Sequence, residues 1–278
     1  MKKNTIILAM LLIMSVNLIG QDLKLMTYNI KYDNTKDTVN NWNDRKATLI
    51  NLILHYKPSF IGTQEALHHQ VNYIDKGLSN FSFVGVGRDD GNRKGEYTAI
   101  HYDHTKFKVR DSNTFWLSKT PEKVSVGWDA AMERICTYGL FEHLKTKDKF
   151  YVFNTHFDHM GEKAREKSAK LILKKIKIIN DENLPVVLMG DFNLGPEEKP
   201  IQQIKSKMQD GKDITEQPFY GPEGTFNGFD WNMELDRRID YIFVKKFKVK
   251  SYIHIDDQMQ NNKHISDHLP VLISVEKL

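Results

Sequence analysis

The sequence predicts an α/β fold, a four-layer sandwich in which two packed, mainly antiparallel β-sheets are flanked by helices. Many strand-like runs follow one another without an intervening helix, so a simple series of βαβ units does not account for them. Residues 162–179, by contrast, carry the apolar stripe of a helix that packs on one face. Two sheets packed face to face, with helices outside, accommodate both observations. No long linker interrupts the 278 residues, and we expect one domain at residues 21–278.

The first half of the chain is expected to hold short strands and one clear helix. Residues 43–55 have helical character because Ala47, Ile50 and Leu54 recur on one face. Strand-like runs lie on both sides of this helix, and the first two end in polar residues. In order, the expected strands are residues 24–30, 59–64, 81–86, 97–102 and 107–117.

The second half repeats the pattern around the longer helix, residues 162–179. Its stripe consists of Ala169, Ile172, Leu173, Ile176 and Ile179, and lysines cover the remaining faces. The strands expected in this half are residues 135–144, 150–157, 185–189, 239–244, 249–255 and 269–275.

The amino terminus has the pattern of a secretory signal peptide, residues 1–20. Lys2 and Lys3 precede an apolar stretch at residues 6–19, and Gly20 provides a small residue near the expected cleavage point. The stretch is shorter than the roughly 20 residues that span a bilayer, which favours cleavage over the alternative of an uncleaved anchor. We therefore expect a secreted or periplasmic protein without a transmembrane span in its mature chain. Cys136 is the only cysteine, so no intramolecular disulfide can form.

The net charge of the chain does not by itself indicate a nucleic-acid partner. Removing Lys2 and Lys3 from the formal net charge of +4 leaves +2. Nucleic-acid binding usually needs a clustered basic face, so nucleic acid remains one substrate class among several. We expect a monomer.

The densest chemical pattern follows the strand at residues 185–189. Gly190 marks the strand end, and Asp191 and Asn193 follow one residue apart. Strand alternation would put these two side chains on the same face, where a carboxylate base would lie beside an amide. Alone, such a pair is also a common turn.

Polar residues occur at or near several predicted strand ends. Each segment alone is weak, because a terminal Asn is usually a turn residue and a lone His is usually a surface group. Their occurrence together along the whole chain is the strong observation. The segments are residues 28–30, 64–65, 154–159, 190–193, 238–243 and 266–270.

These segments resemble the endonuclease/exonuclease/phosphatase superfamily, which has the deoxyribonuclease-I-like fold. The resemblance runs from about Leu23 to the carboxyl terminus. Its most specific pieces are the Gly-Asp-x-Asn run at residues 190–193 and the Ser-Asp-His run at 266–268, with Arg-Ile-Asp-Tyr-Ile at 238–242 also typical. Residues 87–91, 95–97 and 154–161 look like a bacterial, often secreted branch. The resemblance implies a divalent-metal phosphoesterase.

The resemblance also implies a metal site and a set of catalytic groups. Glu65 is the expected ligand of Mg²⁺, with Mn²⁺ as the alternative, because a hard cation prefers carboxylate oxygen. Asn29 and Asp267 lie in segments that approach the same ion. Asp191 would act as the base or orienter for the attacking water, and Asn193 would hold the phosphate or the water.

The remaining implied roles belong to histidines and their partners. His268 would donate to a phosphoryl oxygen, and Asp240 would orient it or favour its charged form. His156 matches a second histidine near the leaving oxygen, and Glu96 matches the acid that pairs with it. Arg88 is a candidate for substrate contact, with an ordinary surface arginine as the alternative.

The sequence leaves the substrate open among nucleic acid, a phospholipid head group and a small phosphorylated metabolite. A sphingomyelinase-type enzyme would need an exposed aromatic hairpin, for which Phe115-Trp116 is a faint candidate. Thr155 to His159 resembles part of a metallo-β-lactamase zinc signature, but Asn154 stands where a His ligand is needed. A binding module that kept the fold and lost the chemistry is the competing class.

Overall fold

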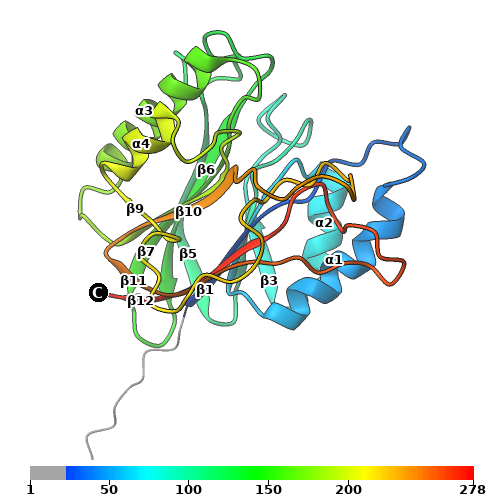
Figure 1. Cartoon of the computed structure of the whole chain (residues 1–278). Coiled ribbons are helices and arrows are strands. Elements are labelled where there is room, and N and C mark those ends of the chain that lie inside the picture. The colour runs from blue at the N-terminus through cyan, green and yellow to red at the C-terminus, as the bar shows by residue number, and fades with distance from the viewer. Residues whose placement is uncertain (1–22) are drawn as a thin grey trace, which may run out of the picture.

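The computed structural model describes residues 23–278, so the predicted signal peptide at residues 1–20 lies outside the described residues. Two six-stranded sheets pack face to face, with two helices beside each sheet (Figure 1). The predicted four-layer α/β sandwich is confirmed. Among the described residues, no helix is both long and apolar enough to cross a membrane.

The two sheets are built on the same plan. Each contains one parallel pair, β1–β2 in the first sheet and β7–β8 in the second, and all other neighbours are antiparallel. The first sheet has the order β11 (Phe247–His254), β12 (Val271–Lys277), β1 (Leu23–Asn29), β2 (Phe60–Gln64), β4 (Ile100–Asp103), β3 (Phe81–Val84). The second has the order β5 (Phe107–Trp116), β6 (Ile135–His143), β7 (Lys149–His156), β8 (Val186–Asp191), β10 (Asp240–Lys245), β9 (Gln209–Asp210).

Helices α1 (Trp42–Tyr56) and α2 (His68–Gly77) lie beside the first sheet, and α3 (Glu162–Ile179) and α4 (Lys199–Lys205) lie beside the second (Figure 1). Helix α3 has the predicted ends. The predicted face of α1 was wrong at Ala47 and Leu54, which are exposed, because the helix buries Leu49 and Ile53 beside the correctly predicted Ile50. Short elements such as α4 and β9 were not predicted, since few residues carry their pattern.

Three apolar layers separate the four structural layers. The middle layer lies between the sheets and contains Leu25, Phe60, Val187, Ile242 and Ile273. One outer layer packs α1 and α2 on the first sheet, and the other packs α3 and α4 on the second. Trp116 is buried, so it is part of the core rather than of an exposed hairpin.

The inward-facing side chains of the central strands change from apolar to polar along each strand. In β1 the inward positions run from Leu25 through Thr27 to Asn29. In β8 they run from Val187 through Met189 to Asp191. Because side chains alternate along a strand, the middle layer therefore ends in a group of buried polar residues. This polar end positions the candidate site.

A buried amide joins the two sheets just below this polar end. Asn154 of β7 donates from Nδ2 to the carbonyl oxygens of Thr63, at 2.9 Å, and Ala99, at 2.8 Å. Its Oδ1 accepts from Nε2 of Gln64 at 2.7 Å. Asn154 is fully buried, so these hydrogen bonds satisfy the polar atoms that folding removes from water. They fix the end of β2 against β7.

Two buried histidines predict how the stability of the fold depends on pH. Burial lowers the pKa of His101 from 6.5 to about 3 and that of His254 from 6.5 to about 4. Both are therefore neutral in the folded chain, whereas the unfolded chain binds protons below pH 6.5. The stability that these two neutral histidines contribute is fully present above pH 6.5 and is lost as the pH falls toward their folded-state pKa values. We expect each histidine to cost about 2 kcal/mol of unfolding free energy between pH 7 and pH 5.

Urea unfolding of the wild type and of His101→Gln at both pH values tests this expectation. The loss between pH 7 and pH 5 should be smaller in the variant by about 2 kcal/mol, because carboxylates and His254 contribute equally to both proteins. Equal losses in the two proteins would contradict the prediction.

Candidate active site

The polar end of the middle layer gathers side chains from distant parts of the chain. Asn29 lies at the end of β1, Glu65 directly after β2, and Asp191 at the end of β8. Asp240 opens β10, and His268 lies three residues before β12. All but Glu65 are buried, and Glu65 is partly buried. The structure thus brings together residues up to 239 positions apart in the sequence.

Asn29 connects the carboxylates of this group. Its Nδ2 lies 3.0 Å from Oε1 of Glu65 and 3.0 Å from Oδ2 of Asp191. Its Oδ1 accepts from the backbone N–H of Lys31 at 3.1 Å. Ser266 donates from Oγ to the backbone carbonyl of Asn29 at 2.7 Å. The amide therefore fixes Glu65 and Asp191 relative to each other.

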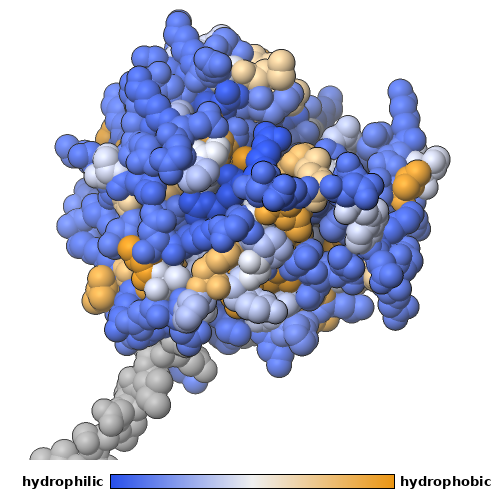
Figure 2. Space-filling model, in the orientation of Figure 1, coloured by the Kyte–Doolittle hydropathy of each residue, from blue (hydrophilic) through white to orange (hydrophobic). Residues whose placement is uncertain are grey.

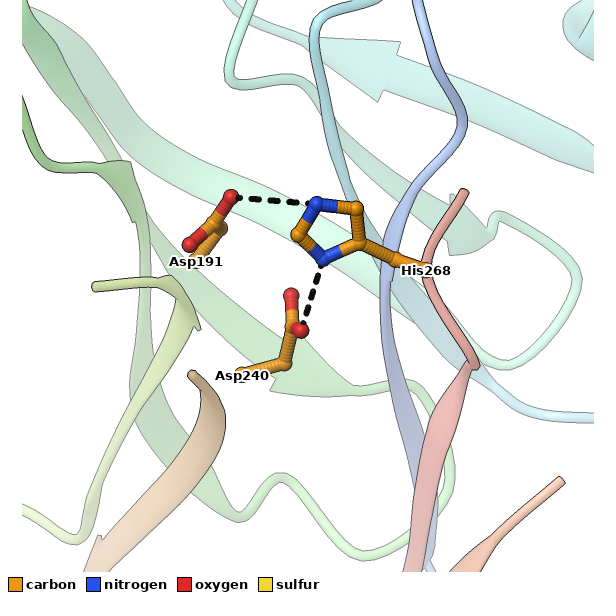
Figure 3. Close-up of side chains that lie close together, drawn as sticks. All are labelled: Asp191, Asp240 and His268. Atoms are coloured by element: carbon orange, nitrogen blue, oxygen red, sulfur yellow. Dashed lines mark hydrogen bonds and ion pairs between the residues drawn. The ribbon is translucent and has the colours of Figure 1, made fainter. Parts of the chain in front are cut away.

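His268 lies between two aspartates (Figure 3). Its Nδ1 is 2.8 Å from Oδ2 of Asp240, and its Nε2 is 3.7 Å from Oδ2 of Asp191. Burial opposes the charged form, but the two carboxylates outweigh it and raise the pKa of His268 to about 10. The ring is thus an imidazolium at neutral pH. Thr225 donates from Oγ1 to Asp240 Oδ2 at 2.6 Å and fixes that carboxylate.

The surroundings of Asp191 disfavour its charged form, whereas those of His268 favour the charged form. Burial and the neighbouring charge of Asp240 raise the pKa of Asp191 to about 7, although His268 and the hydrogen bonds from Asn193 and Asn29 oppose the rise. Its pKa therefore lies close to neutral pH, which suits a group that exchanges protons with water.

Two carboxylates at the rim hold a positive charge between them. Lys31 Nζ lies 3.4 Å from Oε2 of Glu65 and 3.0 Å from Oδ2 of Asp267. Burial raises the pKa of Glu65, but Lys31 and the hydrogen bond from Asn29 outweigh it and lower the pKa overall. These oxygens, with Oδ1 of Asn29, are the hard donors that Mg²⁺ or Mn²⁺ prefers. The donor set fits such an ion, and the ammonium group marks a place where positive charge is stable.

Asp191, Asp240 and His268 also offer three ligand atoms within 4.8 Å of one another. Their hydrogen bonding argues against a metal at that place. Nδ1 of His268 is already bonded to Asp240, and a charged imidazolium repels a cation. We interpret this cluster as a charged histidine that is hydrogen-bonded to Asp240 and lies 3.7 Å from Asp191, beside the carboxylate pair Glu65–Asp267.

Unusual backbone conformations occur at the strand ends of the site. Lys31, Glu65 and Asn193 have φ angles of 58°, 63° and 51°, which non-glycine residues rarely adopt. Strain of this kind concentrates at functional sites, where surrounding contacts enforce it. Gly190 is needed for close packing, because a Cβ there would lie 2.0 Å from the carbonyl oxygen of Thr155 in β7.

The expectation that strand alternation places Asn193 beside Asp191 was wrong. Strand β8 ends at Asp191, and Asn193 lies in a turn whose backbone N–H donates to Asp191 Oδ1 at 2.9 Å. The turn still brings the amide to the site, because Nδ2 of Asn193 lies 3.2 Å from Nε2 of His156.

His156 forms the other side of the site. Its Nε2 lies 3.4 Å from Asp191 Oδ2, and its Nδ1 lies 3.9 Å from Glu96 Oε2. Burial, followed by the charges of Arg134 and Arg88, lowers the pKa of His156 well below its usual value, so the ring is neutral.

Arg88 is the bidentate partner of Glu96, with N–O distances of 2.6 and 2.9 Å. Its side chain is only 12% exposed, so the alternative of an ordinary surface arginine was wrong. Burial nevertheless raises the pKa of Glu96 to about 7, with Arg88 opposing the rise and Glu65 adding to it.

Sequence reasoning missed three residues of this region: Lys31, Thr225 and Arg134. Lys31 could have been noticed as a lysine two residues after Asn29, but nothing in the sequence links Thr225 to Asp240. Arg134 donates to Asp158 at 3.3 Å and lies 3.0 Å from His159 Nδ1. Asp158 also accepts from the backbone N–H groups of the two residues directly before α3, so this pair is structural.

The geometry agrees with comparisons to known proteins. Residues 26–268 match the profile of the Endonuclease/Exonuclease/phosphatase family. The chain belongs to this family. A similar solved structure is the endonuclease/exonuclease/phosphatase from Bacteroides vulgatus, which is 38% identical with a TM-score of 0.88 and covers 92% of this chain and 99% of that chain.

A second family structure, described as a mannosyl-6-phosphatase, comes from Bacteroides thetaiotaomicron. It is 36% identical with a TM-score of 0.88 and covers 91% of this chain and 99% of that chain. The uncharacterized protein L388 of Acanthamoeba polyphaga mimivirus is 27% identical over 260 residues, which are 86% of this chain and 94% of that protein. Family membership and these neighbours make the chain a phosphoester hydrolase.

Proposed function

We propose that the chain is an exported, divalent-metal-dependent phosphatase that hydrolyses the phosphomonoester of a phosphorylated sugar by in-line attack of water. One observation carries the proposal. Asn29 donates from Nδ2 to Glu65 and to Asp191, and His268 lies between Asp191 and Asp240, at the polar end of the core. A binding module that had lost its chemistry would not need this complete set.

Glu65, Asp267 and Asn29 would hold the metal ion through carboxylate and amide oxygens. When bound, the ion supplies positive charge that neutralises the phosphoryl oxygens and the leaving oxygen. Glu65 is held in place for this role, because the side chain of Asn29 and the backbone N–H of Tyr32 both donate to its carboxylate.

His268 is the proposed donor to a phosphoryl oxygen. Its charged ring carries a proton on Nε2. The other ring proton, on Nδ1, is donated to Asp240, with 2.8 Å between Nδ1 and Oδ2. Negative charge on the phosphoryl group strengthens the Nε2 hydrogen bond as the reaction proceeds. Thr225 acts one step further out by fixing Asp240.

Asp191 is the proposed acceptor of the proton from the attacking water. A pKa raised by burial brings this carboxylate close to working pH, where a general base is effective. Asn193 would orient the water or the phosphate. Because Asn193 donates to Nε2 of His156, the tautomer consistent with the network carries its proton on Nδ1, toward Glu96. This neutral histidine would lie near the leaving oxygen.

The sugar-phosphate substrate class draws on the Bacteroides thetaiotaomicron mannosyl-6-phosphatase, which aligns over nearly its whole length. The other classes have less support. Phe115 and Trp116 are 5% and 7% exposed, so they do not form the exposed hairpin of a sphingomyelinase-type enzyme. A nuclease would require stronger positive charge than the +2 of residues beyond the signal segment.

We expect the purified mature chain to hydrolyse mannose 6-phosphate with Mg²⁺ or Mn²⁺ and to lose about 100-fold or more of this activity after chelation. Phosphate release should return when either ion is added back. Parallel assays with bis(p-nitrophenyl) phosphate and DNA would separate a phosphatase from a diesterase. A folded, metal-loaded protein that is inert on every phosphoester would refute the proposal.

Export is proposed from the pattern of residues 1–20. Sequencing the amino terminus of the protein recovered outside the cytoplasm would test it, with Gln21 or a close neighbour expected as the first residue. Recovery of an uncleaved cytoplasmic chain would contradict it.

A further inference from the structure

Trp231 is an exposed aromatic residue in a turn that is hydrogen-bonded to the backbone of Asp267. Trp231 is 48% exposed and stacks on the ring of His264, with centroids 4.4 Å apart and planes inclined by 13°. His264 is 6% exposed and therefore a fixed support. The face shown in Figure 2 is largely hydrophilic, with apolar residues in small separate groups. The other exposed residues of the turn around Trp231 are mostly polar, and a single supported ring in such surroundings suits one small ligand rather than a lipid bilayer.

The turn that carries Trp231 is attached to the backbone of Asp267. The N–H groups of Asn227 and Gly228 donate to the Asp267 carbonyl at 2.8 and 3.1 Å. The side chain of Asn227, which is fully buried, donates to the carbonyl of Ser266 at 3.0 Å. The turn therefore cannot shift independently of the proposed metal ligand.

Chain length limits how far Trp231 can lie from the site. Trp231 lies four positions after Asn227, so the two Cα atoms are at most about 14 Å apart. Asp267 lies three positions after His264, a span of at most about 11 Å. Trp231 and its support His264 are therefore both tied through short segments to Asp267, one member of the carboxylate pair Glu65–Asp267.

The charges around Trp231 distinguish between ring-bearing ligands. Asp230, Glu234 and Asp236 are exposed on the same turn, with Arg237 as its one exposed cation. This surplus of carboxylates repels a polyanionic nucleic acid but accepts hydrogen bonds from sugar hydroxyls. The negative face of an indole also attracts the C–H groups on the apolar face of a pyranose.

We propose that Trp231, supported by His264, is the platform on which the sugar ring of a phosphorylated carbohydrate stacks while its phosphate lies at the site. The proposal rests on the proposed function, since it names the part of the protein that recognises the leaving group. Trp231 is thereby a specificity-determining residue rather than a participant in the phosphoryl chemistry.

Two phosphomonoesters of primary alcohols provide the test. Mannose 6-phosphate carries a ring, and glycerol 3-phosphate does not. Trp231→Ala should lower kcat/KM for mannose 6-phosphate roughly 10-fold, mainly through KM. Glycerol 3-phosphate should change by no more than about 2-fold, as for a surface substitution. Trp231→Phe keeps a stackable ring and should restore most of the loss, and Leu54→Ala on α1 is the exposed apolar control.

Equal losses on both substrates would reveal a structural role and overturn the proposal, as would no loss on either. If Trp231→Ala lowered kcat/KM only for AMP, a nucleoside monoester, the group that stacks on Trp231 would be a nucleobase rather than a sugar ring. Binding can also be followed without turnover, through the indole N–H resonance of Trp231 during titration with mannose 6-phosphate. If the wild type hydrolyses neither ester, the proposed function fails, and a shifted or unshifted resonance still decides the platform.

Discussion

Asp191→Asn is expected to lower kcat/KM for a phosphomonoester by about 10³-fold or more while leaving the chain folded. The amide keeps the size of the carboxylate but cannot accept the proton of the attacking water. Relief of repulsion with Asp240 offsets the loss of one hydrogen bond from Asn29 or Asn193. We therefore expect the unfolding free energy to stay within about 2 kcal/mol of the wild type.

Steady-state kinetics and urea unfolding of the same preparation would measure both effects. Asp181→Asn makes the same chemical change at an exposed carboxylate between α3 and β8 and should leave both quantities unchanged. An Asp191→Asn enzyme with near wild-type kcat would remove this residue from the reaction and leave His156 as the next candidate base.

Glu65→Gln is expected to weaken the binding of Mg²⁺ or Mn²⁺ by at least about 10-fold. The neutral amide removes one of the two carboxylates that flank Lys31 Nζ, and a hard cation loses its strongest donor. Calorimetric titration with each ion would measure the affinity directly. Activity of the variant should recover partly at high metal concentration, because weaker binding can be overcome by mass action.

Glu182→Gln, at an exposed carboxylate in the loop before β8, is the matched control. Unchanged metal affinity in Glu65→Gln would place the ion elsewhere. The alternative in that case is the cluster of Asp191, Asp240 and His268, and Asp240→Asn would then be the informative variant.

The architecture could be predicted because its main elements carry local patterns. Helix α3 has a regular apolar stripe, and its predicted ends match the structure. Helix α1 was harder, since Leu49, Leu52, Ile53 and Leu54 surround much of its circumference and do not fix which face is buried. Sequence spacing shows that such a helix exists better than it shows its rotation.

Only the residues of the candidate site could be predicted, and not the contacts between them. The resemblance named the residues that gather at the polar end of the core, whereas their roles stay predictions. What the sequence could not supply are contacts between distant segments. Lys31 between two carboxylates, Thr225 on Asp240 and the hydrogen bonds of Asn154 between the sheets all depend on how the two sheets meet. Trp231 belongs to the same group, because its support, His264, lies 33 positions away in the chain.

The position of β12 in the first sheet has a consequence for folding during synthesis. Strand β12 lies between β11 and β1, so the final residues of the chain pair with the first strand of the domain. During synthesis, the first sheet cannot close until β12 has been made and can pair with both neighbours. Asp267 and His268 immediately precede this closing strand. A chain cut before residue 267 would lack these two residues of the candidate site as well as the strand that joins β11 to β1.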